Sequence, residues 1–227
     1  MPRGKQSKGQ CVYCKIEGAK NGMTKHLTTC EKRQALMHEA EHSKRDRETL
    51  YHLRIQDAWR PDFWLDVEIG SSRTLKDLDF YLRSIWLECC GHLSQFSLGG
   101  GPGGEIALKR RVDEVFKRTD QLTHIYDFGT TSETVLKVVE TREGRATTTH
   151  PIALLARNLP PEAKCKECSQ PASWLCMECV IEQEEWGTLC EQHAKKHPHD
   201  NYGEPIPLVN SPRLGMCGYE GPADPPY

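Results

Sequence analysis

Apolar and polar residues alternate along two segments in the first third of the chain. Residues 51–55 (YHLRI) and 63–69 (FWLDVEI) carry apolar side chains at every second position, which is the pattern of strands that bury one face. Residues 58–62 (AWRPD), which lie between them, have the composition of a hairpin connection. These segments therefore predict two neighbouring strands joined by a turn.

The clearest helical periodicity follows, over residues 74–90. Thr74 and Asp77 fit a capping box at its start, and Gly91 is placed to end it. Five residues recur at the intervals of one apolar helix face: Leu75, Leu78, Leu82, Ile85 and Cys89.

Shorter strand-like segments continue beyond this helix. Residues 99–104 (GGGPGG) separate two of them and lack the Lys-Ser/Thr of a phosphate-binding loop, so a mobile surface loop is favoured over a nucleotide site. The order strand, strand, helix, strands predicts an α+β domain resembling a β-grasp. The further strands are expected at residues 93–98, 106–109, 124–128, 134–140 and 151–156.

Composition excludes a membrane-spanning protein and favours a cytoplasmic one. The 227 residues are 37% hydrophobic and 27% charged, and no apolar run approaches the roughly 20 residues that span a bilayer. The basic N-terminus has no apolar stretch behind it, so it does not predict a secretory signal.

Charge is distributed unevenly. Residues 1–33 carry eight Lys or Arg and two Glu, a net charge of +6, so the remainder must sum to −8 within a chain of net charge −2. This basic arm predicts an anionic partner such as nucleic acid, with a solvated charged terminus as the alternative interpretation.

Cysteine and histidine spacing gives the most specific chemical signal. The first unit reads C-x2-C-x11-H-x3-C, in which the last two residues are four apart, as on one helical face. It resembles the short Cys-Cys-His-Cys relatives of nucleic-acid zinc fingers, whose helix would present Lys20, Lys25 and Thr28 to phosphates or bases. The expected zinc ligands are Cys11, Cys14, His26 and Cys30.

A second set of ligands is found near the C-terminus, in four pairs that suit two further zinc ions. The pairs are Cys165/Cys168, Cys176/Cys179, Cys190/His193 and His197/His199. The pattern resembles a B-box zinc finger, and this resemblance implies interleaved sites: the first and third pairs hold one ion, and Cys176, Cys179 and His197 hold the other. The fourth ligand of the latter is either His199 or Cys217.

The middle of the chain resembles the plasmid pRiA4b Orf-three-like domain. The residues that carry this resemblance are 64–98, IYDFG at 125–129 and VNSPRLGMCGYEG at 209–221. The resemblance implies an α+β fold over about residues 50–157. Some members carry a transposon-resolvase label, but no serine-recombinase active site can be placed on these residues. Residues 126–128 form either a functional corner or a strand end that turns at Asp127 and Gly129.

Fully ligated zinc sites are structural, whereas a catalytic ion needs an open position. We therefore expect a non-enzymatic, zinc-binding interaction adaptor with three zinc ions and a protein partner. The alternative is a nucleic-acid-binding regulator that acts through residues 1–33 and is linked to mobile elements. The predicted parts are a finger with a basic arm (1–33), a helical connector (34–48), the α+β domain (49–157), a linker (158–163), a B-box-like module (164–200) and a Pro/Gly-rich tail (201–227).

Overall fold

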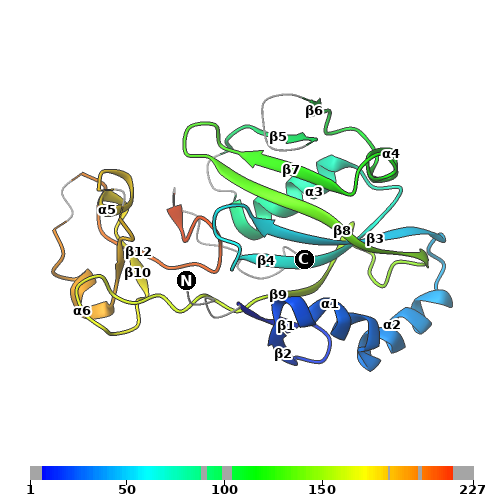
Figure 1. Ribbon diagram of the computed structural model, residues 1–227, viewed down its shortest axis with the longest axis horizontal. Coiled ribbons are helices and arrows are strands. Elements are labelled where there is room, and N and C mark those ends of the chain that lie inside the picture. The colour runs from blue at the N-terminus through cyan, green and yellow to red at the C-terminus, as the bar shows by residue number, and fades with distance from the viewer. Residues whose placement is uncertain (1–6, 88–90, 99–103, 184, 199–200, 217–227) are drawn as a thin grey trace.

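A single large antiparallel sheet dominates the fold (Figure 1). The computed structural model describes residues 7–87, 91–98, 104–183, 185–198 and 201–216. Within them nine strands pair in the order β2-β1-β9-β4-β3-β8-β7-β5-β6, and every neighbouring pair is antiparallel. The strands are β1 (Lys8–Cys11), β2 (Glu17–Ala19), β3 (Glu48–Asp57), β4 (Trp64–Gly70), β5 (Ser94–Ser97), β6 (Glu105–Ile106), β7 (Gln121–Tyr126), β8 (Ser132–Gly144) and β9 (Ile152–Asn158).

The alternating segments form strands where predicted, although β4 is buried on both faces instead of one. β3 and β4 form an antiparallel hairpin in which Leu50 lies opposite Gly70, and the later strand-like segments overlap β5 to β9. The segment at 106–109 was expected to be a strand throughout, but β6 ends at Ile106. The chain turns there, because the Arg110 N–H donates to the Ala107 carbonyl at 2.9 Å and leads into α4 (Val112–Phe116).

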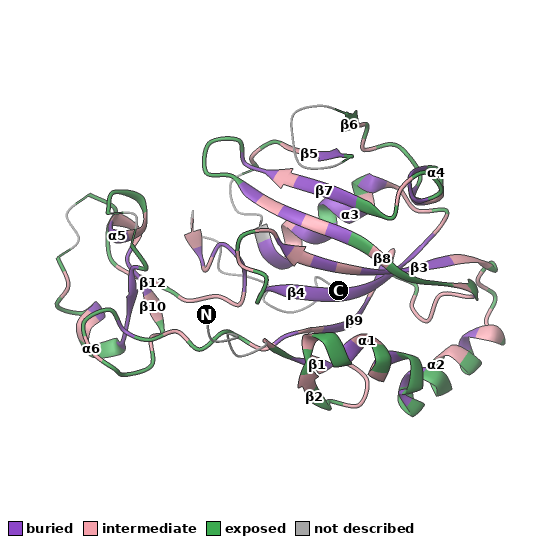
Figure 2. Cartoon of the chain, viewed as in Figure 1, coloured by how far each residue is buried: buried purple, intermediate pink, exposed green. Residues whose placement is uncertain are grey.

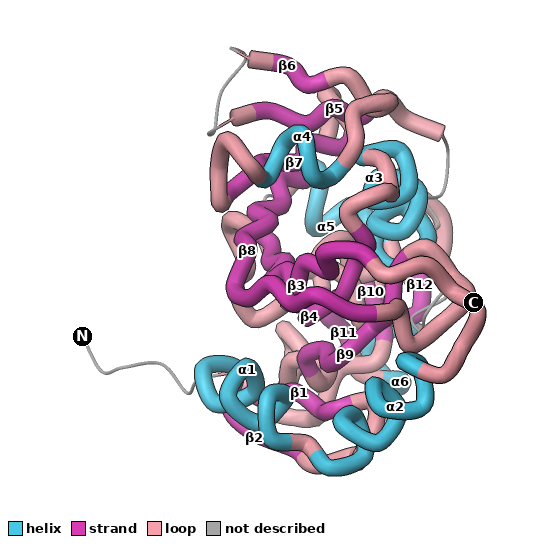
Figure 3. Tube along the Cα trace, turned by 90° about the vertical axis from the view of Figure 1, so that its right-hand side faces the viewer, coloured by secondary structure: helices cyan, strands magenta, loops and turns pink. Residues whose placement is uncertain are grey.

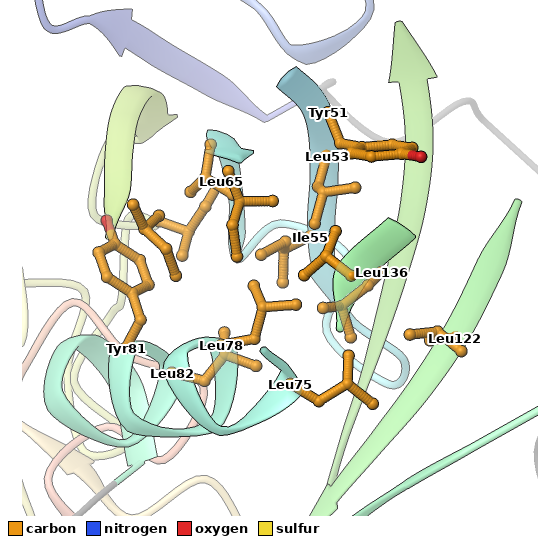
Figure 4. Close-up of a cluster of buried hydrophobic side chains, with 14 of the residues drawn as sticks. Tyr51, Leu53, Ile55, Leu65, Leu75, Leu78, Tyr81, Leu82, Leu122 and Leu136 are labelled. Atoms are coloured by element: carbon orange, nitrogen blue, oxygen red, sulfur yellow. The ribbon is translucent and has the colours of Figure 1, made fainter. Parts of the chain in front are cut away.

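The main hydrophobic core lies between the sheet and the predicted helix (Figure 4). This helix is α3 (Leu75–Leu82), which continues as a π-helical turn over Arg83–Leu87. The Asp77 carboxylate accepts the Thr74 backbone N–H at 2.8 Å, as a capping box requires. Four members of the predicted apolar face are fully buried, namely Leu75, Leu78, Leu82 and Ile85. Cys89 lies outside the described residues, and Gly91 has the positive φ of a helix stop.

Part of the opposite face of the sheet, over β1, β9 and β4, is covered by α1 (Lys20–Thr29) and α2 (Glu31–Glu41). In Figure 3 these helices lie below β9, while α3 and α4 lie above β3. All seven residues of β4 are consequently buried (Figure 2), including the acidic Asp66 and Glu68. A side chain at Gly9 would collide with the Trp64 ring at 2.3 Å, so glycine lets β1 pass over this ring.

Buried ion pairs fix these two helices to the sheet. Arg54 donates to both oxygens of Asp66 at 2.8 Å and to the Thr24 hydroxyl of α1 at 2.9 Å. Arg33 of α2 donates to Glu68 at 3.1 Å and to the Leu27 carbonyl at 2.9 Å. The N-terminal unit is thereby part of the same layered structure as the central sheet.

A smaller unit follows β9 and stands beside the sheet (Figure 1). It contains a three-stranded sheet and two short helices: β10 (Trp174–Leu175), β11 (Thr188–Leu189), β12 (Ile206–Pro207), α5 (Met177–Ile181) and α6 (Glu191–Ala194).

The chain then returns to the large sheet through residues 209–214, here called the return segment. At the end of β9, the Asn158 side-chain amide donates to the Asn210 side-chain oxygen at 2.8 Å, and the Asn210 side-chain amide donates to the Asn158 backbone carbonyl at 3.1 Å. The Ser211 hydroxyl donates to the Trp86 carbonyl at 2.5 Å. The buried Arg213 donates to Asp127 at 3.0 Å and to Ser132 at 3.0 Å. The return segment is therefore a structural piece of the central domain.

The fold is α+β, as the element order predicts, with candidate metal-binding clusters at both ends of the chain. None of the described helices has the length and apolar character needed to cross a membrane.

Candidate metal centres

The first cluster is built by a tight turn after β1 and by the end of α1. Lys15 has a φ of 64°, and its N–H donates to the Cys11 carbonyl at 3.0 Å, which folds Cys11 and Cys14 into one knuckle. His26 lies in the last turn of α1. Cys30 was expected on the same helical face, but α1 ends at Thr29 and Cys30 adopts an extended conformation before α2 begins.

The four ligand atoms of this cluster lie within 4.8 Å of one another. Cys11 Sγ is 3.9 Å from Cys30 Sγ, and Cys14 Sγ is 3.2 Å from His26 Nε2. Ligands about 2.3 Å from a tetrahedral ion stand about 3.8 Å apart, so these separations suit one metal ion.

The first cluster is packed against the sheet. Cys11 and Cys30 are buried with Met23, Leu27 and Trp64 in a second hydrophobic cluster. Burial raises the pKa of the Cys11 thiol to about 11, although the backbone N–H groups of Cys14 and Tyr13 oppose this shift. Metal binding at this position therefore displaces a proton and brings a compensating positive charge into the site.

The second cluster combines the first and third cysteine pairs of the C-terminal unit. Its members are Cys165, Cys168, Cys190 and His193, all within 4.8 Å of one another. His193 Nδ1 is 3.3 Å from both Cys165 Sγ and Cys190 Sγ. Although burial opposes it, N–H donors of the Cys190 and Glu167 backbone, together with the His193 ring, lower the pKa of Cys165 to about 6.

The third cluster contains Cys176, Cys179 and His197. Cys179 Sγ is 3.1 Å from His197 Nε2. A Cβ at Gly187 would lie 2.3 Å from the Cys176 carbonyl oxygen, so this knuckle requires glycine beside it. Both residues considered for the fourth ligand, His199 and Cys217, lie outside the described residues, so the choice between them stays open.

Two charged side chains link the second and third clusters. Both come from the knuckle between Cys165 and Cys168. Lys166 Nζ lies 3.3 Å from Cys179 Sγ. Glu167 Oε1 is 2.5 Å from His197 Nδ1, and its Oε2 is 3.8 Å from His193 Nε2. A carboxylate on the outer nitrogen of a ligand histidine fixes the ring and increases its basicity. Glu167 contacts one such ring in each cluster.

The structure thus brings together eleven of the sequence-predicted ligands, in the first set that the spacing predicts and in the two C-terminal sets that the B-box resemblance implies. These clusters are geometrically compatible with three metal ions. Sequence reasoning missed Lys166 and Glu167, although their place inside a Cys-x2-Cys pair was a signal.

Histidines outside these sets have other partners. His52 is buried and lies 2.9 Å from Asp66, and His124 is fully buried and lies 2.9 Å from Asp79. His38 of α2 and His42, the residue directly after this helix, contact each other with ring centroids 5.1 Å apart. None of these four joins a cluster of ligand residues within the described parts of the chain.

The segment 126–128 is a strand end. Asp127 has a φ of 62°, and its carboxylate accepts the N–H groups of Gly129 at 3.0 Å and Thr130 at 3.2 Å, which makes the turn. Its second oxygen accepts from Arg213. Two segments that carry the family resemblance are therefore in direct contact.

Comparisons with known proteins identify no family. No family model matches the chain, and no curated protein matches it. Among solved structures, it is similar to the protein of unknown function MM3350 from Methanosarcina mazei Go1, with 17% identity and a TM-score of 0.40. The matched region covers 46% of this chain and 66% of that chain, just under two thirds of its length. A similarity of this size supports no conclusion about fold or function.

Proposed function

We propose that this chain is a non-enzymatic zinc protein in which three structural zinc ions hold together an interaction adaptor. The observation that carries the proposal is the composition of the clusters, which combine thiolates with imidazoles. Such ligands in tetrahedral spacing favour Zn²⁺ over ions that prefer oxygen. Two of the clusters supply four protein ligands each, which leaves no position for a catalytic water.

The adaptor part of the proposal rests on a recess between the large sheet and the C-terminal unit. It measures about 780 Å³ and is lined by the β3–β4 turn, residues 160–164 and parts of the C-terminal unit. Trp59 and Trp186 on its walls are 75% and 61% exposed. Exposed aromatic side chains are enriched in protein interfaces, where they supply much of the binding energy.

Contacts across this recess hold its two sides together. The Arg60 guanidinium lies 4.7 Å from the centre of the Trp186 ring and donates to the Pro212 carbonyl at 2.8 Å. A partner would therefore meet a surface that is already formed, which lowers the entropic cost of binding.

Metal counting by native mass spectrometry tests the zinc assignment. We expect three tightly bound zinc ions per chain. Two ions, with a third that is lost easily, would indicate an open third cluster and favour a metalloenzyme. A chain without zinc would refute the proposal.

The adaptor is tested by affinity capture with the intact chain and two matched variants. Trp59→Ala removes an exposed aromatic ring from the recess, whereas Phe80→Ala removes one from α3 outside it. We expect a protein partner to be retained stoichiometrically by the natural chain and by Phe80→Ala, and lost from Trp59→Ala at unchanged zinc content. If Trp59→Ala and Phe80→Ala retain equal amounts of the partner, this use of the recess is refuted. If nuclease treatment releases the captured material, the partner is bound through nucleic acid.

A second candidate is a nucleic-acid-binding regulator that uses residues 1–33. Lys25 and Thr28 are exposed on the outer side of α1, which favours it. Lys20 contributes less, since its ammonium group donates to the Pro61 carbonyl at 2.9 Å. This candidate predicts an affinity that falls steeply with salt concentration and depends on Lys25.

We also propose that the central domain is β-grasp-like and belongs to the pRiA4b Orf-three-like family. The packing of α3 across one sheet face and the pairing of Asp127 with Arg213 support this. A cytoplasmic location is proposed because the three clusters need reduced thiols as ligands, and such thiols persist in reducing compartments.

A further inference from the structure

A strongly basic recess lies at the end of the large sheet where α2 passes into β3. It measures about 590 Å³ and is lined by residues 44–48, residues 71–73, Arg111, Ala146, Thr148 and Thr149. Backbone contacts hold two of these segments together, because the Val112 N–H donates to the Arg73 carbonyl at 2.8 Å and Thr74 pairs with Arg111. The recess shares no residue with the three metal clusters.

Positive charge in this recess is only partly compensated. Two carboxylates line it, Asp46 and Glu48, together with five cationic side chains: Lys44, Arg45, Arg47, Arg73 and Arg111. Glu48 is already engaged, since it accepts the Ser71 hydroxyl at 3.0 Å and the Ser72 N–H at 2.7 Å.

Only two of the five cations have a carboxylate partner among the described residues. Arg47 pairs with Glu41, and Arg111 lies 3.3 Å from Asp113. Lys44, Arg45 and Arg73 form no ion pair with any described residue. Three cationic groups from two separate segments thus line the recess without a direct ion pair among the described residues, in a chain whose net charge is negative.

Arg45 provides an independent indication of a ligand. Its Nε is shielded from solvent and has no hydrogen-bond partner among the described atoms. A buried donor on a charged group is unfavourable unless an acceptor reaches it. Because this atom has almost no solvent-accessible surface, an anion in the recess would supply that acceptor once the Arg45 side chain turns toward it.

The remaining lining residues indicate which anion fits. Ser72, Thr148 and Thr149 add hydroxyl donors, and no aromatic residue is present on which a base could stack. Arginine forks and hydroxyls together match phosphate oxygens. We propose that this recess binds a phosphate-ester or polyphosphate anion through its phosphate groups, carried either by a nucleic-acid backbone or by a free polyphosphate compound.

The test uses the full chain, loaded with zinc, and two probes. One is a fluorescein-labelled single-stranded oligonucleotide of about 20 nucleotides, longer than one binding unit covers. The other is inorganic tripolyphosphate, titrated directly by calorimetry. Lys44→Gln and Arg73→Gln each remove one cation from the recess, and Lys25→Gln removes one from α1 outside it. Lys44 is exposed, so its substitution leaves the fold intact.

We expect Arg73→Gln to weaken binding about tenfold, the lower end for loss of a charged hydrogen bond. Each recess variant should also reduce the salt dependence of oligonucleotide binding by about 0.7 in the log–log slope. Lys25→Gln should bind like the natural chain. Binding of tripolyphosphate alone would identify a free phosphate compound, and binding of the oligonucleotide alone would identify nucleic acid.

Three results would overturn the proposal: neither probe binds, the recess variants bind as tightly as the natural chain, or Lys25→Gln weakens binding as much as Arg73→Gln does. Zinc content and partner capture are measured separately. Failure here is therefore distinguishable from failure of the proposed function.

Discussion

Glu167 is expected to control metal affinity in two clusters at once. Glu167→Gln keeps an amide oxygen that can accept from the outer nitrogen of His197, but it removes the negative charge that the ligand ring now faces at 2.5 Å. Outer-shell partners of this kind contribute about 10- to 100-fold to metal affinity. Because the Glu167 side chain is 36% exposed, solvent screens part of this interaction. We therefore expect a loss of about tenfold in the third cluster, at the lower end of that range.

The loss should be smaller in the second cluster, since the other carboxylate oxygen lies 3.8 Å from His193 Nε2, beyond hydrogen-bonding distance. The first cluster does not contact Glu167, so it serves as an internal reference in the same molecule. Glu167→Ala removes both the charge and the acceptor, and it should weaken the third cluster more than Glu167→Gln does.

Competition with a chromophoric chelator measures how many zinc ions per chain are released at each chelator concentration. In Glu167→Gln, the ion of the third cluster should be released at a clearly lower chelator concentration than in the natural chain, and the ion of the second cluster at a slightly lower one. The ion of the first cluster should be released at the same concentration as in the natural chain. Glu182→Gln is the matched control, because this carboxylate belongs to the same unit, is exposed and does not contact a ligand. The reasoning fails if Glu167→Gln releases zinc like the control, or if all three ions are weakened equally.

Three further outcomes are expected. Cys30→Ser should release the first ion and increase hydrogen exchange in β1 and β9, because this ligand packs in the cluster that joins them; unchanged protection would contradict this. Arg213→Met should lower the free energy of unfolding by about 3 kcal/mol, since it leaves the buried Asp127 without its cation, and urea unfolding measures the loss. Burial lowers the pKa of His124, so only the unfolded state gains a proton as pH falls below about 6.5, and stability should decline there. His124→Gln, which keeps a donor toward Asp79, should flatten that decline in thermal unfolding with zinc in excess; an unchanged profile would refute the assignment.

Local patterns were enough to predict most elements and the residues that gather in the three candidate metal clusters. The alternation at 51–55 and 63–69 and the heptad-like spacing from Leu75 to Ile85 each describe one segment against one core, and the structure follows them. Ligand pairs are equally local, because a knuckle or a helix turn fixes two ligands within a few residues.

Contacts between distant segments could not be predicted in this way. Asp66 and Glu68 occupy the polar positions of an alternating strand, which usually face water. They are buried because α1 and α2 cover that face, and their counterions Arg54 and Arg33 come from β3 and α2. The periodicity of the strand itself therefore could not predict that these two carboxylates are buried or which residues pair with them.

The return segment illustrates the same limit. Residues 209–214 read as part of a Pro/Gly-rich tail, yet Arg213 is only 2% exposed and bonds with a turn more than 80 residues earlier. Its importance depends on a partner that only the tertiary structure supplies.

Because Asn158 and Asn210 are hydrogen-bonded, the C-terminal unit is an insertion between β9 and the return segment of the central domain. The chain leaves the sheet after Asn158 and comes back beside the same residue at Asn210, so the C-terminal unit begins and ends at neighbouring positions. During synthesis, β9 is available to pair with β1 and β4 before the return segment has left the ribosome, so we expect the contacts of the return segment to form last. A fragment that stops within residues 158–163 would keep every strand of the large sheet and still lack its final closing contacts.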